Sequence, residues 1–424
     1  MQAQRINLDH YAGTPLLPEV RQAMEAALDE CGNPSSIHAT GRAAKQLLER
    51  ARKQVAALIN AAPSEVFFTS CGTEANNWAL RGLYAANKRK GNHVIISSIE
   101  HPSISLMARR LEVDSGARVT ILPVDHEGLV SPAALKDALT PQTVLVSVML
   151  ANGEVGTVEP AQELAAIAHE HGALFHTDAV AAAGHWPIDV KALGIDALTL
   201  AANQFYGPPG AAALFVREGV RILPLLEGGG QETGGRSGTE ALPAIVGMGA
   251  AAETAKRELP QRIERLSRLR DRLREGLVEC IEHLRLNGPS DVRRVTRSQG
   301  SHPPAAGGAG SVRRGEDGWD GAAAGPAEQL PHNLHVCVDG VSSESLVLGL
   351  DQAGIAAGLG SACNSKAMRP SHVLKAMGLS DEQAKGALVL TVGAPTTDEE
   401  IDRALEVIPA VVQRLRNVTA LTAR

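Results

Sequence analysis

The stretch VLVSVMLANGEVGTVEPAQELAAIAHEHGALFHTDAV, residues 144–180, decides the fold. It begins with an apolar run at 144–149, continues into a segment with helical periodicity at 160–171, and ends in a second apolar run at 174–177. Two buried strands joined by a helix form the unit from which parallel sheets are built, because neighbouring parallel strands need a long crossover between them.

The same pattern extends on both sides of this unit, from about residue 66 to about residue 216. The further strands expected are 66–69, 94–97, 119–122, 198–200 and 212–216. Strands that alternate with helical stretches favour an α/β fold with a mostly parallel, doubly wound sheet. In such a sheet, ligands bind beyond the carboxyl ends of the strands.

The chain of 424 residues is long enough for two domains. We expect a large domain at 16–255 and a smaller α+β domain formed by 1–15 together with 256–424. One or two long helices, from about 240 to 286, would link the two domains. The smaller domain should contain strands and helices at 333–338, 343–351, 370–377, 387–392 and 397–415.

A segment rich in Gly, Ala, Pro, Ser and Arg interrupts the smaller domain at 290–329. It has almost no apolar residues, so it cannot bury enough surface to offset the entropy cost of ordering. We therefore expect a disordered insert there.

Composition excludes several classes of protein. The net charge is −6, and no basic run is long enough to indicate nucleic-acid binding. No apolar stretch approaches the ~20 residues that cross a bilayer, and the first residues lack a signal-peptide pattern. The five cysteines have neither disulfide-framework nor zinc-site spacing. These features predict a cytoplasmic protein with no resident metal.

Polar residues follow the expected strands at the points where the strands end. Gly72 and Thr73 open a helix after the first strand, a position that suits a phosphate group. His101, Asn152 and Asp178 follow three further strands. Each residue alone has an ordinary structural explanation, such as a helix cap or a core histidine. Together at one edge of one sheet, they predict a binding site.

These residues belong to a series of motifs that resembles the cysteine desulfurases, pyridoxal-phosphate (PLP) enzymes of the class-V aminotransferase group. The matches run from residue 8 to about residue 401, and the long cysteine loop resembles the branch with an extended loop. The motifs are LDHYAGTP (8–15), GNPSSIH (32–38), FTS (68–70), GTE (72–74), EH (100–101), NGEVG (152–156), HTDA (176–179), GGGQE (228–232), RSGT (236–239) and GSAC (360–363).

The resemblance implies a fold-type I homodimer with PLP at the end of the parallel sheet. His101 would stack on the pyridine ring, and Asp178 would pair with the ring nitrogen so that the ring can accept electrons. Asn152 would bond the ring hydroxyl. Gly72 and Thr73 would hold the phosphate.

The resemblance also implies the path of sulfur. Asn33 would help to bind the carboxylate of L-cysteine, and Thr239 would reach the phosphate in the partner subunit. Cys363 would take the sulfur as a persulfide and pass it to an acceptor or iron–sulfur scaffold protein. Cys363 is also a possible ligand of a cluster during assembly. An unused, inherited cysteine is the alternative explanation.

The family pattern breaks at its PLP lysine. The segment AANQFYGPPG (201–210) aligns through its Tyr-Gly-Pro, which puts Gln204 at the lysine position. No lysine occurs between Lys191 and Lys256. A glutamine amide can neither form a Schiff base nor shuttle protons. We therefore expect PLP to bind noncovalently, if at all.

Other family residues are lost with the lysine. Ala201 replaces a phosphate-binding serine, Asn203 a histidine, and Ala181 a glutamine that bonds the ring oxygen. Val389 stands where an arginine would clamp the substrate carboxylate, a contact worth about 2–4 kcal/mol.

Two functions follow from these residues. The first is sulfur transfer from L-cysteine to Cys363 for iron–sulfur cluster or thio-cofactor assembly, with covalent PLP catalysis impaired by Gln204. The second is a non-catalytic homologue that acts as a dimeric scaffold, a regulator or a relay for sulfur from a persulfide donor. A weaker third hypothesis is a different small-molecule site, made more apolar by Ala181, Ala201 and Val389.

Overall fold

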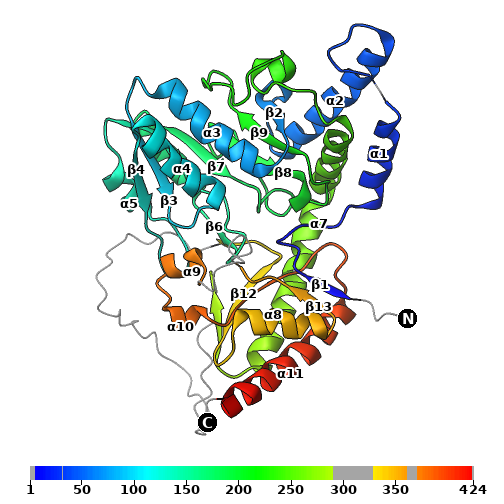
Figure 1. Ribbon diagram of the computed structural model, residues 1–424, viewed down its shortest axis with the longest axis vertical. Helices are drawn as coiled ribbons and strands as arrows, with labels where there is room; N and C mark the ends of the chain where they lie inside the picture. Colours follow the sequence, from blue (N-terminus) through cyan, green and yellow to red (C-terminus); the bar gives the residue numbers. More distant parts are fainter. Residues whose placement is uncertain (1–4, 31, 290–327, 361–369, 423–424) are drawn as a thin grey trace, which may run out of the picture.

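The computed structural model describes residues 5–30, 32–289, 328–360 and 370–422. Its centre is a seven-stranded sheet, drawn in Figure 1, with the order β2-β9-β8-β7-β5-β3-β4. The strands are β2 (Val66–Thr69), β3 (His93–Ser97), β4 (Arg118–Leu122), β5 (Thr143–Ser147), β7 (Leu174–Asp178), β8 (Ala197–Ala201) and β9 (Ala212–Val216).

All seven expected strands are present, and the sheet is mostly parallel. β9 pairs antiparallel with both of its neighbours, β2 and β8, while the pairs from β8 to β4 are all parallel. The predicted helix at 160–171 is α6 (Ala161–Glu170), which connects toward β7. The predicted α/β fold is therefore confirmed.

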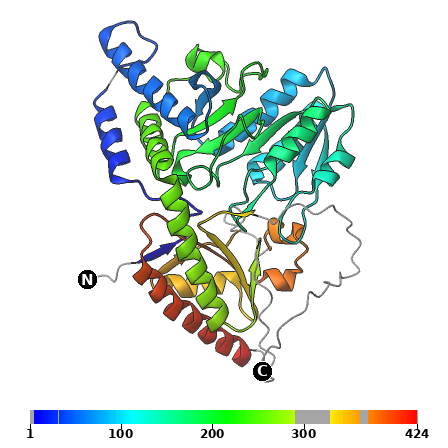
Figure 2. The ribbon, with the colours of Figure 1, turned by 180° about the vertical axis from the view of Figure 1, so that it is seen from behind.

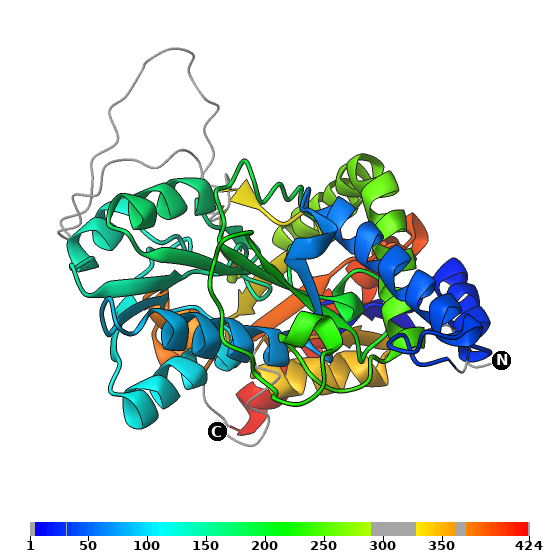
Figure 3. The ribbon, with the colours of Figure 1, turned by 90° about the horizontal axis from the view of Figure 1, so that it is seen from above.

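Helices cover both faces of the sheet because alternate side chains of each strand point to opposite faces. Ile96 packs with α3 (Gly72–Asn87) and α4 (Pro102–Ser115), whereas its neighbour Ile95 packs in the core that includes α6. Figure 3 shows α3 and α4 together on one side of the sheet. α5 (Pro132–Ala138) lies near α6, and on that same face α2 (Ala39–Leu58) packs beside the start of α7.

One long helix, α7 (Leu242–Cys280), leads from the large sheet into the smaller part of the molecule (Figure 2). α1 (Pro18–Leu28) packs on it near its start. The expected helical region to about 286 is too long. After Ile281 leaves the helix with extended dihedrals, β10 (Leu284–Asn287) pairs with β12 (Asn333–Val338). Strand pairing outweighs the local helical pattern there.

The smaller part has its own core. β14 (Ala387–Thr391) completes a three-stranded antiparallel sheet with β10 and β12, and β1 (Ile6–Leu8) pairs with β13 (Ile355–Ala357). The C-terminal half of α7 packs against this core through Leu266, Leu269, Leu273 and Leu277. Its other helices are α8 (Ser343–Gln352), α9 (His372–Ala376), α10 (Asp381–Ala384) and α11 (Asp398–Thr422).

Two of the predicted boundaries, the limit between the domains and the end of the insert, can be compared with the structure. The limit between 255 and 256 falls inside the continuous helix α7, so the domain assignment stays a prediction. Residues 290–327 lie outside the described residues. The insert was drawn two residues too long, since β11 (Glu328–Gln329) pairs with β6 (Thr157–Val158).

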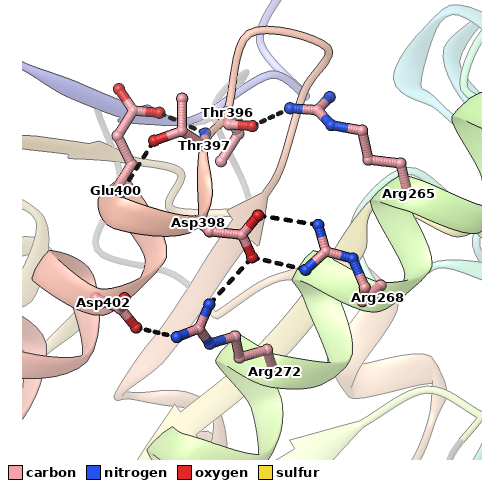
Figure 4. Close-up of polar contacts among 8 residues, drawn as sticks. All are labelled: Arg265, Arg268, Arg272, Thr396, Thr397, Asp398, Glu400 and Asp402. Carbon is pink, nitrogen blue, oxygen red and sulfur yellow. Dashed lines mark hydrogen bonds and ion pairs between the residues drawn. The ribbon is translucent and has the colours of Figure 1, made fainter.

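A group of exposed ion pairs joins α7 to the start of α11 (Figure 4). Arg268 binds Asp398 with both guanidinium nitrogens, at 2.6 and 2.9 Å, and Arg272 bridges Asp398 and Asp402. The hydrogen bond from Arg268 lowers the pKa of Asp398 to about 2. Because all four side chains are exposed, these ion pairs add little to the stability of the fold. Among the described residues, no helix is long and apolar enough to cross a membrane.

Candidate active site

The structure brings the predicted site residues to one edge of the large sheet. Gly72 follows β2, His101 follows β3, Asn152 follows β5, Asp178 ends β7, and Gln204 follows β8. These strands all run in the same direction, so their carboxyl ends meet. The five residues therefore lie at the carboxyl ends of parallel strands, and their role in a common site remains a prediction.

Asp178 is the buried carboxylate of this edge. It accepts hydrogen bonds from Asn76 Nδ2 at 2.6 Å and from the Val180 backbone N–H at 2.9 Å. Burial raises its pKa, while the hydrogen bonds and the nearby charge of His101 act in the opposite direction. A protonated ring nitrogen would match this carboxylate.

His101 is the N-cap of α4, and its Nδ1 accepts from the backbone N–H of Ser103 at 3.2 Å. The Ser103 hydroxyl lies 2.7 Å from the same nitrogen and also contacts Asn76. This fixes the orientation of the imidazole. Beside it, burial raises the pKa of Glu100 to about 8, which makes Glu100 mostly protonated at neutral pH.

The side chain of Asn152 is used within the protein. Its Oδ1 accepts from the backbone N–H groups of Glu154 and Val155, and its Nδ2 donates to the Ile99 carbonyl at 3.2 Å. These bonds shape the turn after β5. The second N–H of Nδ2 points to Met149 Sδ at 3.4 Å, so the expected bond from Asn152 to a ring hydroxyl would replace this weak contact and could keep the bond to Ile99.

The backbone N–H groups at the start of α3 are the groups that would hold a phosphate. A methyl group on Gly72 would lie 3.0 Å from the Val180 side chain and 3.6 Å from Ala201, so this turn packs closely on the ends of β7 and β8. Thr73 is exposed on the first turn of the helix. Ala201 has no hydroxyl to add to the N–H groups, so the helix start is left with fewer donors than the family pattern has.

Gln204 does not extend freely into the site. Its Nε2 donates to the backbone carbonyl of Tyr11 at 3.0 Å. The backbone carbonyl of Gln204 accepts a hydrogen bond from His185 Nε2 at 2.9 Å. Both ends of the residue are therefore bonded to neighbouring segments.

Three of the other predicted residues belong to segments outside the large sheet. Asn33 and Thr239 are exposed. Val389 is fully buried on β14 and exchanges two backbone hydrogen bonds with Gly358. Cys363 lies outside the described residues.

Sequence reasoning missed several residues that the fold brings to this site. Asn76, one turn into α3, holds Asp178, and its Oδ1 is buried without a hydrogen-bond partner among the described residues. His185, which binds the Gln204 backbone carbonyl, lies against His332 with ring centroids 4.0 Å apart and ring planes tilted by 33°, and a charge on His10 would lower the pKa of both. A polar residue on the buried face of α3 was a possible signal for Asn76. No local signal joins three histidines so distant in sequence.

This arrangement fits PLP at one end and fails at the other. The buried Asp178 suits a pyridine nitrogen, and the α3 start suits a phosphate. At the position that the resemblance assigns to the PLP lysine, the aldehyde would find Gln204, whose amide is not nucleophilic and is already bonded to Tyr11. Covalent PLP does not fit these residues. Among the described residues, no group of His, Cys, Asp and Glu side chains could hold a metal ion.

The fold and the strand-end site define a class: an α/β protein of the PLP-dependent transferase architecture. The class-V aminotransferase family matches residues 6–298. The chain is 43% identical over 420 residues to a cysteine desulfurase IscS of Methanosarcina thermophila, covering 99% of this chain and 95% of the relative. It is 42% identical over 419 residues to one from Clostridium botulinum, covering 99% and 97%. The chain therefore belongs to the cysteine desulfurase family of class-V aminotransferases.

Solved structures agree with the family. A NifS-like protein superposes with a TM-score of 0.83 at 30% identity, covering 97% of this chain and all of the other. DndA from Streptomyces lividans gives a TM-score of 0.70 at 29% identity, covering 89% and 97%. The predicted fold type is confirmed by these neighbours.

Proposed function

We propose that this chain is a sulfur-transfer protein of the cysteine desulfurase family. Sulfur that originates in L-cysteine would reach a persulfide on Cys363 and pass to an acceptor or scaffold protein in iron–sulfur cluster or thio-cofactor assembly. The observation that carries the proposal is the full-length match to cysteine desulfurases together with the retained strand-end residues Asp178 and His101. A cytoplasmic homodimer, with Thr239 facing its partner, belongs to the same proposal.

The step at residue 204 would differ from that of the relatives. PLP, if bound, would be held noncovalently by Asp178, His101 and the start of α3, and it would supply an electron sink. Gln204 cannot take up or release the protons that a lysine would. We infer that release of sulfur from free cysteine is strongly impaired.

A second candidate function is a sulfur relay or a scaffold. It is favoured by the hydrogen bond from the Gln204 side chain to the Tyr11 carbonyl, because this bond gives residue 204 a structural role. In a relay, the Cys363 thiolate attacks the outer sulfur of a donor persulfide and forms a new persulfide. The donor leaves as a thiolate, so atoms and electrons balance without an oxidant.

Purified protein mixed with PLP is expected to lack a Schiff base. Borohydride reduction, followed by mass spectrometry of the chain, should leave its mass unchanged. The absorption spectrum should be that of free PLP or of noncovalently held PLP. A stable adduct on any lysine of the site would contradict the interpretation of Gln204.

Persulfide labelling tests the role of Cys363. After incubation with an active cysteine desulfurase and cysteine, we expect a persulfide-specific label on the wild-type chain. The matched control is Cys363→Ala, which keeps the other four cysteines. Equal labelling of both proteins would rule out the relay and leave the scaffold.

A further inference from the structure

The backbone of Tyr11 is fixed on both sides. Its N–H donates to the Thr391 hydroxyl at 2.9 Å, and its carbonyl accepts from Gln204 Nε2 at 3.0 Å. A few residues on, Thr14 binds the Asn203 carbonyl through both its N–H and its hydroxyl, each at 2.9 Å. The segment 11–14 is thus fastened along the segment that carries residue 204.

The ring of Tyr11 packs directly on the turn that contains Gly153. A methyl group placed on Gly153 would lie 2.3 Å from Tyr11 Cε2 and 3.2 Å from Ala181 Cβ. Only a residue without a side chain lets the ring approach so closely. The turn is itself held, because Asn333 Nδ2 donates to the Gly153 carbonyl at 2.6 Å.

Tyr11 therefore contacts or adjoins both positions at which the aldehyde end of PLP would need a polar group. The backbone carbonyl of Tyr11 accepts a hydrogen bond from the side-chain amide of Gln204. The Tyr11 ring and the Ala181 methyl group both lie close to Gly153. A glutamine at 181 would compete with the ring for the space next to Gly153, because packed interiors leave little room for extra atoms.

We propose that Tyr11 is the residue that excludes the aldehyde end of PLP from this site, with Gln204 acting as the clasp that holds Tyr11 in place. This deepens the proposed function, on which it rests. Tyr11, Ala181 and Gln204 act as one unit, so exchanging residue 204 alone does not reopen the site.

The test is a series of variants titrated with PLP. The series contains Gln204→Lys, Tyr11→Ser, the double Tyr11→Ser/Gln204→Lys, and the triple that adds Ala181→Gln. Affinity is read from the absorption spectrum, and covalent attachment from the chain mass after borohydride. Tyr11→Phe is the matched control, because it keeps the ring.

We expect Gln204→Lys alone to form little adduct, and the double variant to bind PLP at least about 10-fold more tightly than Gln204→Lys. The triple variant should form adduct in most chains. Tyr11→Phe/Gln204→Lys should behave like Gln204→Lys. Full adduct formation by Gln204→Lys alone, or equal affinity of the serine and phenylalanine variants, would overturn the proposal.

Thermal unfolding of each variant confirms that it is folded. If the serine variants do not fold, Tyr11→Leu, which keeps apolar contact with Gly153 but lacks the ring, takes their place with the same expected order. Persulfide labelling of Cys363 is measured separately in the wild type without PLP. A failed label therefore speaks against the sulfur relay, while the PLP titration speaks only to Tyr11.

Discussion

Glu232→Ala is expected to lower the free energy of unfolding by about 3 kcal/mol, since it removes the buried carboxylate that pairs with both terminal nitrogens of Arg52 and leaves this guanidinium with exposed Glu49, at 3.3 Å, and the Val66 carbonyl. Glu232 is 1% exposed at its side chain, and both of its oxygens bind the two terminal nitrogens of Arg52 at 2.7 Å. Its Oε2 also accepts from the backbone N–H of Phe68, the third residue of β2. The pair thereby ties the loop before Arg236 to α2 and to the sheet.

Urea unfolding of the purified variant measures this loss. Asp398→Ala is the matched control, because it removes an equally bidentate but exposed pair with Arg268, together with the exposed pair to Arg272, and it should lower the stability much less than Glu232→Ala does. Replacing both partners, as Arg52→Met/Glu232→Leu, should cost less than Glu232→Ala alone. Similar losses for Glu232→Ala and Asp398→Ala would show that burial of the pair is unimportant.

His10→Gln is expected to flatten the dependence of stability on pH. Burial lowers the pKa of His10 to about 4 from an ordinary value of 6.5. Between these values the unfolded chain binds a proton that the folded chain does not, so stability is present above pH 6.5 and is lost as pH falls toward 4. The difference amounts to about 3 kcal/mol for this residue.

Comparing His10→Gln with the wild type removes the contribution of His10 from a pH dependence to which other buried groups also contribute. Burial lowers the pKa of His185 to about 3, and that of His332 well below normal, while the raised pKa values of Glu100 and Glu159 act with the opposite sign. Glu100 and Glu159 contribute equally to both proteins, whereas a charge on His10 helps to lower the pKa of His185 and of His332, so its removal also weakens their part of the pH dependence, in the same direction. The slope of unfolding free energy between pH 6 and pH 4.5 should fall by about 1.4 kcal/mol per unit in the variant. The exposed His126→Gln should match the wild type, and an unchanged slope in His10→Gln would contradict the prediction.

The sheet could be read from the sequence because its strands are short, apolar and bounded by turns. The strand at 66–69 and the strand at 212–216 were predicted with their observed limits. β10 was not, since Leu284 lies seven residues after Leu277 and so continues the helical spacing, and pairing with β12 makes this segment a strand.

The site was predictable where it depends on strand ends and not where it depends on contacts across the chain. His101 and Asp178 were found because each follows a strand, and parallel strands bring their ends together. Asn152 was placed correctly, but the bonds that occupy its amide come from the turn that follows it. Asn76 binds Asp178 across 102 positions of sequence, which no local pattern reveals.

The sequence by itself determined the α/β architecture and the edge of the sheet at which the site lies, because both follow from periodicity, which is local. That position 204 is the one that carries a lysine in the relatives is an expectation from the resemblance to the cysteine desulfurases. The tertiary structure alone decided what Gln204 binds, that the Tyr11 ring rests on Gly153 beside Ala181, and that the rings of His185 and His332 lie against each other. Such contacts join residues far apart in the sequence, for instance Tyr11 and Gln204, which are 193 positions apart. They depend on how the N-terminal segment, the sheet edge and the smaller part pack together, which periodicity does not encode.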